Sequence, residues 1–526
     1  MKRINYLILG IGLLFTFGCK DFLDTQPKAV LNEDSFYKTQ GDAFSALVGC
    51  YDGLQNIHNQ SVGFPVASEV LSDDVFGATG NVDGFGWQMI DEFDPQRSPS
   101  DRSMFEGNWV AYYKALYRIN VFLEKFDQIA WDSDELRSQY EAEVRFMRAF
   151  IYFDMVRLWE KVPLVLKSTS ENPPQAEPDA IYTAIAEDLK FAIENLPGEA
   201  YVPQSSTSGR VTKWAAEALT ARVFLFYTGY YGKSDLVGVI TKSNALEYLE
   251  DVISNSGHGL VDDFANLWPA ASLDNYAGED NIETVFAIKY TFTSDYNGNS
   301  DGNGWLVMLG IREQSIYPYG NGWGGGTVNP KLWNDFDDKD TRKVASIISI
   351  VDEGLDFQKT ESQREYTGYY VKKYTPMSTK SGKNLGDSLG TNFQIGQFQD
   401  YVSIRYADVL LMAAELGSPS AQDYFDQVRQ RAYKDNFSSK TVNQANIMQE
   451  RYFEFAFEGI RYWDLLRQGL DVAAQAVETD ITVLNGGVST EKVIKGSNLK
   501  TCRGFQQIPY NQITRSSGVL VQNTGW

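Results

Sequence analysis

The feature that most constrains the fold is a long run of apolar residues with helical spacing between positions 132 and 163. These residues recur every three or four positions, at Leu136, Tyr140, Val144, Met147, Ile151, Met155 and Leu158. The spacing predicts one amphipathic helix. Asp132 and Glu135 stand at capping-box spacing where this helix begins, and Val162-Pro163 ends it. The chain therefore contains at least one long, packed helix.

Similar patterns recur along much of the chain, at about residues 103–127, 178–195, 211–230 and 243–255. Short connectors such as Leu196-Pro197-Gly198 join the helices in pairs. Paired helices favour an array of helical hairpins of the tetratricopeptide type. Helical spacing returns at Ile404, Ala407, Leu411 and Ala414, and again from about 420 and 443. We predict a mainly α protein whose helical scaffold spans about 40–260 and 400–470.

Residues 260–400 have a different composition, dominated by Gly, Asn, Asp, Ser and Tyr. Residues 294–304 and 320–326 are the extremes, and such stretches form loops and turns. Strand candidates interrupt them at Val285–Tyr290 and Tyr369–Lys373. The last 50 residues are also predicted to be loop-rich. We predict a single domain over residues 19–526, with a ligand-binding, loop-rich part at about 60–100 and 260–400 that contains short strands.

The chain is strongly acidic, because its 526 residues include 69 Asp and Glu against 47 Lys and Arg, a net charge of −22. Such a chain repels phosphate backbones and anionic lipid headgroups, so we predict no nucleic-acid partner. With 43% hydrophobic and 22% charged residues the composition is that of a globular protein.

The N-terminus has the pattern of a removable leader. Lys2 and Arg3 precede the apolar stretch Ile4–Phe17, which is too short to span a bilayer. The sequence then reads Gly18-Cys19, and a small residue directly before a cysteine resembles a bacterial lipobox, although Thr16 departs from the usual Leu. We predict a lipoprotein signal peptide over 1–18 and lipidation of Cys19, which anchors the chain to a membrane without a spanning segment. The alternative is an ordinary signal peptide followed by an incidental cysteine.

The two other cysteines, Cys50 and Cys502, leave two readings open. They either pair in an oxidising compartment or remain as separate buried thiols, because the sequence does not give the distance between them.

Signatures of catalysis and of metal binding are missing from the sequence. His58 and His258 have no metal-ligand partner at i+4 and no Cys-x-x-Cys motif nearby, which argues against zinc. The loop Asp295–Gly304 alternates Asp and Asn as calcium loops do, but Ser300 and Leu306 replace the Gly and Glu that such loops require. We predict no enzyme activity, no cofactor and no metal, and we keep a helical glycoside hydrolase as the alternative.

A regular series of charged residues near the C-terminus has a structural interpretation. Three glutamates repeat every four residues near three arginines: Glu450, Glu454 and Glu458, with Arg451, Arg461 and Arg467. We predict an ion-pair network on a partly buried helix face in preference to a pair of catalytic carboxylates.

The aromatic residues carry the functional prediction. Trp87, Trp305 and Trp323 lie beside glycines, which leave an indole poorly covered by its own neighbours. We predict that they form an exposed platform for sugar rings, which present C–H groups on one face and hydroxyls at the edge. Weaker candidates for the same site are Asp73, Asp74, Asn81, Tyr296 and Tyr319. By contrast, four tryptophans fall within helical patterns and are predicted to lie in the core: Trp109, Trp159, Trp214 and Trp463.

Several motifs, in the same order along the chain, resemble the SusD/RagB family of outer-membrane lipoproteins of Bacteroidetes. They are Cys19–Asp24 (CKDFLD) with Pro27, Ala142–Val156 (AEVRFMRAFIYFDMV) followed by Val162-Pro163-Leu164, Ile404–Glu415 (IRYADVLLMAAE), Val428–Ala432 (VRQRA), Glu450–Arg467 (ERYFEFAFEGIRYWDLLR), Ile508-Pro509 and the ending Gln522–Trp526 (QNTGW).

This resemblance implies a scaffold of tetratricopeptide-like units and a lipid-anchored protein at the cell surface, on the outer membrane. It implies capture of oligosaccharides and their transfer to a SusC-like TonB-dependent transporter. Some relatives handle peptides, so a peptide ligand is a further alternative. The matching motifs belong to the scaffold and supply no ligand-binding residues, so the tryptophan platform is supported by its location in loops alone.

Overall fold

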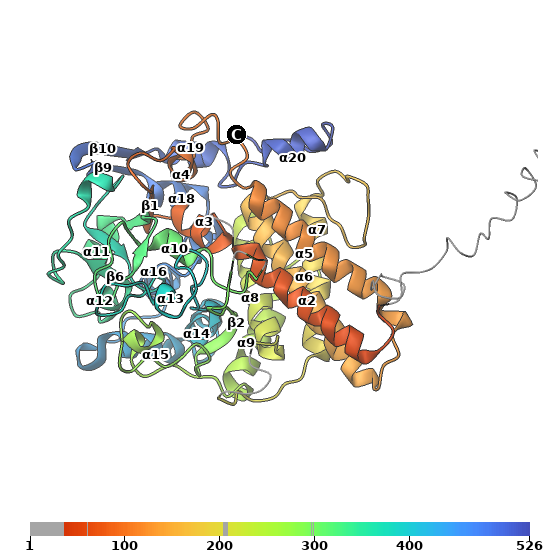
Figure 1. The fold of residues 1–526 in the computed structure, drawn as a ribbon. Coiled ribbons are helices and arrows are strands. Elements are labelled where there is room, and N and C mark those ends of the chain that lie inside the picture. Colours follow the sequence, from red (N-terminus) through yellow and green to blue (C-terminus); the bar gives the residue numbers. More distant parts are fainter. Residues whose placement is uncertain (1–35, 60–61, 204–208, 296, 298) are drawn as a thin grey trace, which may run out of the picture.

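Long helices pair side by side in the first half of the chain. The computed structural model describes residues 36–59, 62–203, 209–295, 297 and 299–526. The long helices are α2 (Gln40–His58), α5 (Glu106–Lys125), α6 (Asp134–Trp159), α7 (Pro178–Asn195), α8 (Lys213–Tyr231) and α9 (Lys242–Asn255). Helix α2 packs on α5, α6 on α7, α7 on α8 and α8 on α9, and together they occupy one end of the molecule (Figure 1). The predicted array of paired helices is confirmed.

Helix α6 lies at the centre of this helical part. Ser133 caps it, because its hydroxyl accepts a hydrogen bond from the N–H of Leu136, so the predicted cap at Asp132 is wrong by one residue. From Tyr140 onward nearly every side chain is buried, since α2, α5, α7 and α8 all contact this helix. The periodic pattern therefore predicted the helix but underestimated how completely its C-terminal half is covered.

The other end of the molecule is built from short elements (Figure 1). Its short helices are α3 (Phe64–Val70), α4 (Gly86–Asp91), α10 (Leu306–Leu309), α11 (Pro330–Asp335), α12 (Arg342–Ser346) and α13 (Leu385–Ser388), with 3-10 helices at Phe264–Leu267, Thr360–Ser362 and Lys434–Asn436. A further 3-10 helix, Phe126–Gln128, directly continues α5 in the long-helix part. The predicted loop-rich composition of 260–400 is thus borne out by a region of turns, short helices and short strands.

Two-stranded pairings hold this region together. Antiparallel pairs join β1 (Val75–Ala78) to β5 (Gly325–Val328), β2 (Thr284–Ile288) to β8 (Tyr401–Arg405) and β6 (Ile347–Ser349) to β7 (Tyr369–Val371). Strands β3 (Ile311–Arg312) and β4 (Asn321–Gly322) are parallel. Both predicted strands exist as β2 and β7. The β1–β5 and β2–β8 pairs connect segments that are more than 100 residues apart in the chain.

The C-terminal part contains more regular structure than predicted. Helices α14 (Tyr406–Glu415), α15 (Ala421–Tyr433), α16 (Gln444–Glu454) and α17 (Arg461–Arg467) follow β8, and α18 (Leu470–Val477) comes next. The last 50 residues then form a hairpin of β9 (Thr479–Asn485) and β10 (Val488–Ile494) and the helices α19 (Gly496–Thr501) and α20 (Tyr510–Arg515). The glycine pair Gly486-Gly487 contributes to the composition that predicts loops. In the structure both glycines have positive φ and form the tight turn of the β9–β10 hairpin.

The glutamates of the 450–458 repeat form a buried ion-pair network, but not with the arginines that were predicted. The Arg405 guanidinium donates to Glu458 Oε2 at 2.7 Å and to Glu454 Oε1 at 2.9 Å, and Arg429 pairs with Glu450 at 2.7 Å. All of these side chains are buried. The predicted partners bind other carboxylates: Arg451 pairs with Asp464, Arg461 with Asp73 and Arg467 with Glu415. The true partners come from β8, α15, α12 (Arg342) and the residues after β7 (Lys373), which helical spacing does not reveal.

Cys50 and Cys502 are separate, buried thiols, and burial raises the pKa of each to about 12. The four tryptophans assigned to the core, Trp109, Trp159, Trp214 and Trp463, are buried as predicted. No helix within the described ranges has the length and apolar character needed to cross a membrane. The predicted signal peptide and Cys19 lie outside the described residues.

Candidate functional site

One surface of the loop-rich part combines exposed rings with paired charges. We call it the Trp323 surface and define it by Asn81, Asp83, Phe85, Arg312 and Trp323. These residues come from the loop after β1, from β3 and from the turn between β4 and β5. The β1–β5 and β3–β4 pairings therefore bring together segments that are more than 200 residues apart.

Trp323 is held by its main chain while its indole stays accessible. The side chain is 39% exposed. The backbone N–H of Trp323 donates to the carbonyl of Val307 at 2.9 Å, and its backbone carbonyl accepts from Arg312 Nη1 at 3.0 Å. The next residue, Gly324, has φ +72°, and a Cβ there would lie 2.8 Å from Arg312 Cβ. Glycine therefore allows the close approach of Arg312 that fixes the Trp323 backbone.

An ion pair lies beside this indole. Arg312 Nη1 is 3.1 Å from Asp83 Oδ2, and the Asp83 carboxylate also accepts the N–H of Gly80 at 2.7 Å. A Cβ at Gly80 would lie 2.3 Å from Arg312 Cζ, so only glycine leaves room for the guanidinium. Asp83 is half-buried, which leaves its carboxylate within reach of a ligand while Arg312 fixes its position.

The loop after β1 starts with an unusual backbone conformation. Ala78 and Thr79 have φ values of 52° and 78°, a region that costs free energy for residues with a Cβ. The surrounding structure maintains it, since the N–H of Thr79 donates to Gly324 and its carbonyl accepts from the N–H of Arg364. These bonds turn the chain out of β1 toward the Trp323 surface.

Phe85 is the second exposed ring of this surface, with 41% of its side chain accessible. The guanidiniums of Arg97 and Arg364 lie 4.5 and 4.2 Å from its ring centroid, a favourable cation–π arrangement. Arg364 also donates to the carbonyls of Gly84 and Asp83, each at 2.6 Å. The loop is therefore tied to a buried arginine and is pre-shaped before any ligand arrives.

Two of the three predicted tryptophans are placed differently from the expectation. Trp305 is only 1% exposed, because Tyr374 and Tyr401 pack edge-on against it at 5.1 and 5.8 Å. It is a core residue, and its expected exposure was wrong. Trp87 is half-buried in α4, and a Cβ at Gly325 would lie 2.6 Å from its ring, so it packs on β5 and supports the loop from beneath. Trp323 is the most exposed of the three, at 39%.

The weaker candidates for the glycan site differ in their exposure. Asn81 is exposed on the Trp323 surface, where it lies close to Gly486 of the β9–β10 turn. Tyr319 is buried, and its hydroxyl donates to Glu353 at 2.6 Å. Tyr296 falls outside the described residues.

Asp73 and Asp74 are both buried below the surface, so the expectation that they meet ligand was wrong. Burial alone would raise the pKa of Asp73, but Arg461, whose Nε lies 2.7 Å from Oδ1, outweighs it and lowers the pKa. Among the described residues, no ion-pair partner lies within reach of the Asp74 carboxylate. Burial, followed by the charge of Asp73, raises the pKa of Asp74 to about 7.

Sequence reasoning missed the partners that make this surface. Phe85 has the same glycine neighbours as Trp87, in Gly84-Phe85-Gly86-Trp87, so the argument used for tryptophan also identifies it. Arg312 and Arg364 carried no signal, because their roles depend on contacts with a loop more than 200 positions away. Across the described ranges, no cluster of three or more His, Cys, Asp or Glu side chains has the geometry of a metal site.

Comparison with known proteins identifies the family. Residues 353–526 match the model of the SusD family, and residues 21–225 match a model described as "Starch-binding associating with outer membrane". The chain belongs to the SusD/RagB family. The resemblance to this family and the predicted mainly α, tetratricopeptide-like fold are thereby confirmed.

Relatives of this SusD/RagB chain extend over most of its length. SusD-like protein P25 of Formosa agariphila is 25% identical over 508 residues, which cover 89% of this chain and 90% of the relative. A laminarin-binding SusD-like protein of known structure has 26% identity and a TM-score of 0.71, with 93% of this chain and 100% of that chain covered. Surface glycan-binding protein A of Bacteroides thetaiotaomicron, solved with laminarihexaose, has 23% identity and a TM-score of 0.73 over the same shares. The names of the two solved relatives describe binding proteins, one for surface glycans and one for laminarin.

Proposed function

We propose that this chain is a glycan-binding protein of the cell surface and that the Trp323 surface holds the sugar. The observation that carries the proposal is an accessible indole next to the Asp83–Arg312 ion pair. An indole face suits the C–H face of a sugar ring, and a carboxylate and a guanidinium suit its hydroxyls.

The fixed geometry of the surface supports this role. Arg312 is bonded to both Asp83 and the Trp323 carbonyl, so ring and charges are held at one relative position. A ligand then loses little free energy in ordering the site, which is the main advantage of a preorganised surface. Phe85, which two neighbouring guanidiniums hold in place and which is 41% exposed, offers a second ring for an adjoining sugar unit.

The names of the relatives indicate which class of ligand to expect. Their names refer to laminarin and laminarihexaose, and one matching family model refers to starch. We therefore expect a glucan or another neutral oligosaccharide.

The test is a panel of neutral oligosaccharides, including laminarin and starch fragments, followed by calorimetric titration of the ligand that binds. Trp323→Ala should weaken binding by about tenfold, as expected for the loss of one stacked ring. Tyr510→Ala, which removes a comparably exposed ring from α20, is the matched control and should bind as the unchanged protein does. Equal affinity in both variants contradicts the site assignment. Release of reducing sugar, or binding of peptides alone, contradicts the function.

We also propose that Cys19 carries the lipid anchor and that the captured glycan passes to a SusC-like TonB-dependent transporter in the outer membrane. Cys19→Ala should release the protein from membranes and abolish labelling with a fatty-acid probe. A tagged protein should co-purify with such a transporter from detergent-solubilised outer membranes. Retention of the variant in the membrane, or purification without a transporter, contradicts these two steps respectively.

A further inference from the structure

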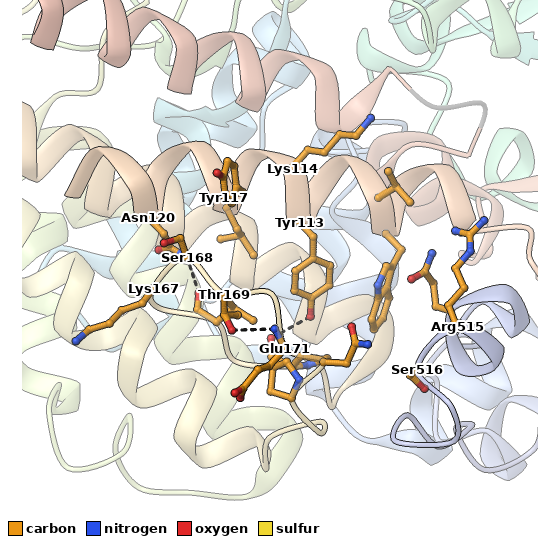
Figure 2. Close-up of a pocket in the computed structure, with 18 of the residues that line it drawn as sticks. Tyr113, Lys114, Tyr117, Asn120, Lys167, Ser168, Thr169, Glu171, Arg515 and Ser516 are labelled. Carbon is orange, nitrogen blue, oxygen red and sulfur yellow. Dashed lines mark hydrogen bonds between the residues drawn. The ribbon is translucent and has the colours of Figure 1, made fainter. Parts of the chain in front are cut away.

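A second concave site lies in the helical part, with no lining residue in common with the Trp323 surface. It is a groove of about 600 Å³ between α5, the loop 163–173 and the segment 512–520 at the end of α20 (Figure 2). Ligand sites typically have volumes of about 300–1,000 Å³ and aromatic linings. We call this site the α5 groove.

Aromatic residues at regular spacing form one wall of the α5 groove. Trp109, Tyr113 and Tyr117 follow one another every four residues on α5, so their backbone positions are about 6 Å apart along the helix. The ring centroids of Trp109 and Tyr113 lie 5.2 Å apart. Exposure increases along this series, from buried Trp109 through half-buried Tyr113 to Tyr117, which is 50% exposed. The wall therefore offers two accessible rings, those of Tyr113 and Tyr117, with Trp109 packed behind Tyr113.

The opposite wall is a loop held in one position. The Tyr113 hydroxyl donates to the carbonyl of Pro163 at 2.9 Å (Figure 2). The carbonyl of Val165 accepts from Asn120 at 2.8 Å and from the Tyr152 hydroxyl at 2.9 Å, and the N–H of Val165 donates to the same hydroxyl. These main-chain groups are already used, so an extended peptide would find few partners for its own backbone. Polar side chains line the rim as well, and several are held by hydrogen bonds within the chain: Ser168 donates to Glu124, Gln512 donates to Glu106, and Thr169 accepts the N–H of Glu171. Each hydroxyl and amide of this kind has further hydrogen-bonding capacity that a sugar hydroxyl can use.

The charges around the α5 groove are opposite in sign to those of the chain as a whole. Four of its lining side chains are cationic, Lys114, Arg118, Lys167 and Arg515, and one, Glu171, is anionic. Arg118 pairs with Asp52 and Arg515 with Glu106. Within the described parts of the chain, Lys114 and Lys167 have no such carboxylate partner.

The two lysines stand at opposite edges of the groove, with their ammonium groups extended away from the Tyr113 ring (Figure 2). Each has a flexible four-carbon side chain that can turn toward a bound anion. Their charges also attract an anion to this one place on a protein of net charge −22.

We propose that the α5 groove is a second binding site, for a short oligosaccharide that carries carboxylate or sulfate groups. The rings of Tyr113 and Tyr117 stack on its sugar units, the polar rim side chains bind its hydroxyls, and Lys114 and Lys167 bind its anionic groups. This site does not depend on the Trp323 surface, because the two differ in location, in lining residues and in the charge of their ligand.

The experiment is calorimetric titration of the full-length chain with trigalacturonate, with its neutral methyl ester and with a sulfated galactose disaccharide. We expect at least one anionic sugar to bind and the methyl ester to bind at least about tenfold more weakly, because charge-assisted hydrogen bonds are lost. The affinity should fall as the salt concentration rises.

Variants assign the binding to the groove. The double variant Lys114→Gln/Lys167→Gln and the single variant Tyr117→Ala should each weaken it by about tenfold, whereas Tyr117→Phe, which keeps the ring, should retain most of it. Trp323→Ala is the control that separates the two sites and should leave this binding unchanged. Because all three positions are exposed, the thermal midpoints should not move. The proposal is overturned if neither anionic sugar binds, if the ester binds equally well, or if the groove variants bind normally. It is also overturned if Trp323→Ala removes the binding.

Discussion

The interior around Arg405 and the Trp323 surface both place charged and aromatic side chains together, but they do so in opposite ways. Around Arg405 every charge is buried and has partners, and its guanidinium binds three glutamates from two distant segments. At the Trp323 surface an ion pair and two rings are equally well fixed, yet they remain accessible. The first arrangement holds helices and strands in place, whereas the second leaves partly satisfied groups facing solvent, which is where a ligand can contribute binding energy.

The family motifs follow the same division. Residues of Glu450–Arg467 supply the buried network and its neighbours, whereas Asp83, Phe85 and Trp323 lie outside every motif that resembles the family. Scaffold residues are therefore expected to control stability, and surface residues are expected to control binding.

The largest effect should come from the interior network. Arg405→Gln leaves Glu283, Glu454 and Glu458 without their shared partner and should destabilise the fold by about 4 kcal/mol. Urea unfolding measures this change, with Arg145→Gln as the control because its pair with Glu141 is partly exposed and contributes at most about 1 kcal/mol. Similar stability losses in both variants would contradict the claim that buried ion pairs stabilise this fold more than partly exposed ones.

The two loop tryptophans provide a sharper version of the same comparison. Trp305→Ala should cost about 3 kcal/mol, because it leaves a cavity beside Tyr374 and Tyr401. Trp323→Ala should cost less, about 1 kcal/mol, since 39% of Trp323 remains exposed to water in the folded chain. If chemical denaturation gives equal losses for the two variants, the assignment of one ring to the core and the other to the surface fails.

Replacing Asp74 with a neutral residue should stabilise the fold, and the gain in free energy of unfolding should depend on pH. Its folded-state pKa of about 7 lies above the usual value of 3.8, so its protonated form favours folding. This contribution is fully present below about pH 4 and is lost as the pH rises through about 7. Asp74→Asn should therefore raise the free energy of unfolding at pH 8 by about 2 kcal/mol and leave it nearly unchanged at pH 4. Thermal unfolding at both pH values checks this, and a larger gain at pH 4 would reverse the sign.

The smallest expected effect is at the surface ion pair. Asp83→Asn should change stability by less than about 1 kcal/mol, while the affinity for a neutral glycan falls about fivefold because one charged acceptor is lost. Calorimetry and thermal unfolding of the same sample measure both quantities. A stability loss without an affinity loss would make Asp83 part of the scaffold.

Much of the fold was predictable, because local periodicity reports helices directly. The positions of α6, α7 and α9 followed from apolar spacing, and β2 and β7 followed from short apolar runs. The site was only partly predictable. Trp305 and Trp323 have similar glycine-rich neighbours, and the difference between them comes from Tyr374 and Tyr401, which return from distant positions. Neighbouring glycines indicate a loop, but they do not show whether another part of the chain covers it.

Hydrogen–deuterium exchange, with and without a neutral glycan that binds, tests the central claim most directly. The account predicts that added protection is confined to the loop 79–86 and to residues 312–324, while the peptides of α5, α6 and α16 exchange as they do without ligand. Protection that falls on the helical scaffold, with none in those two loop segments, would contradict it.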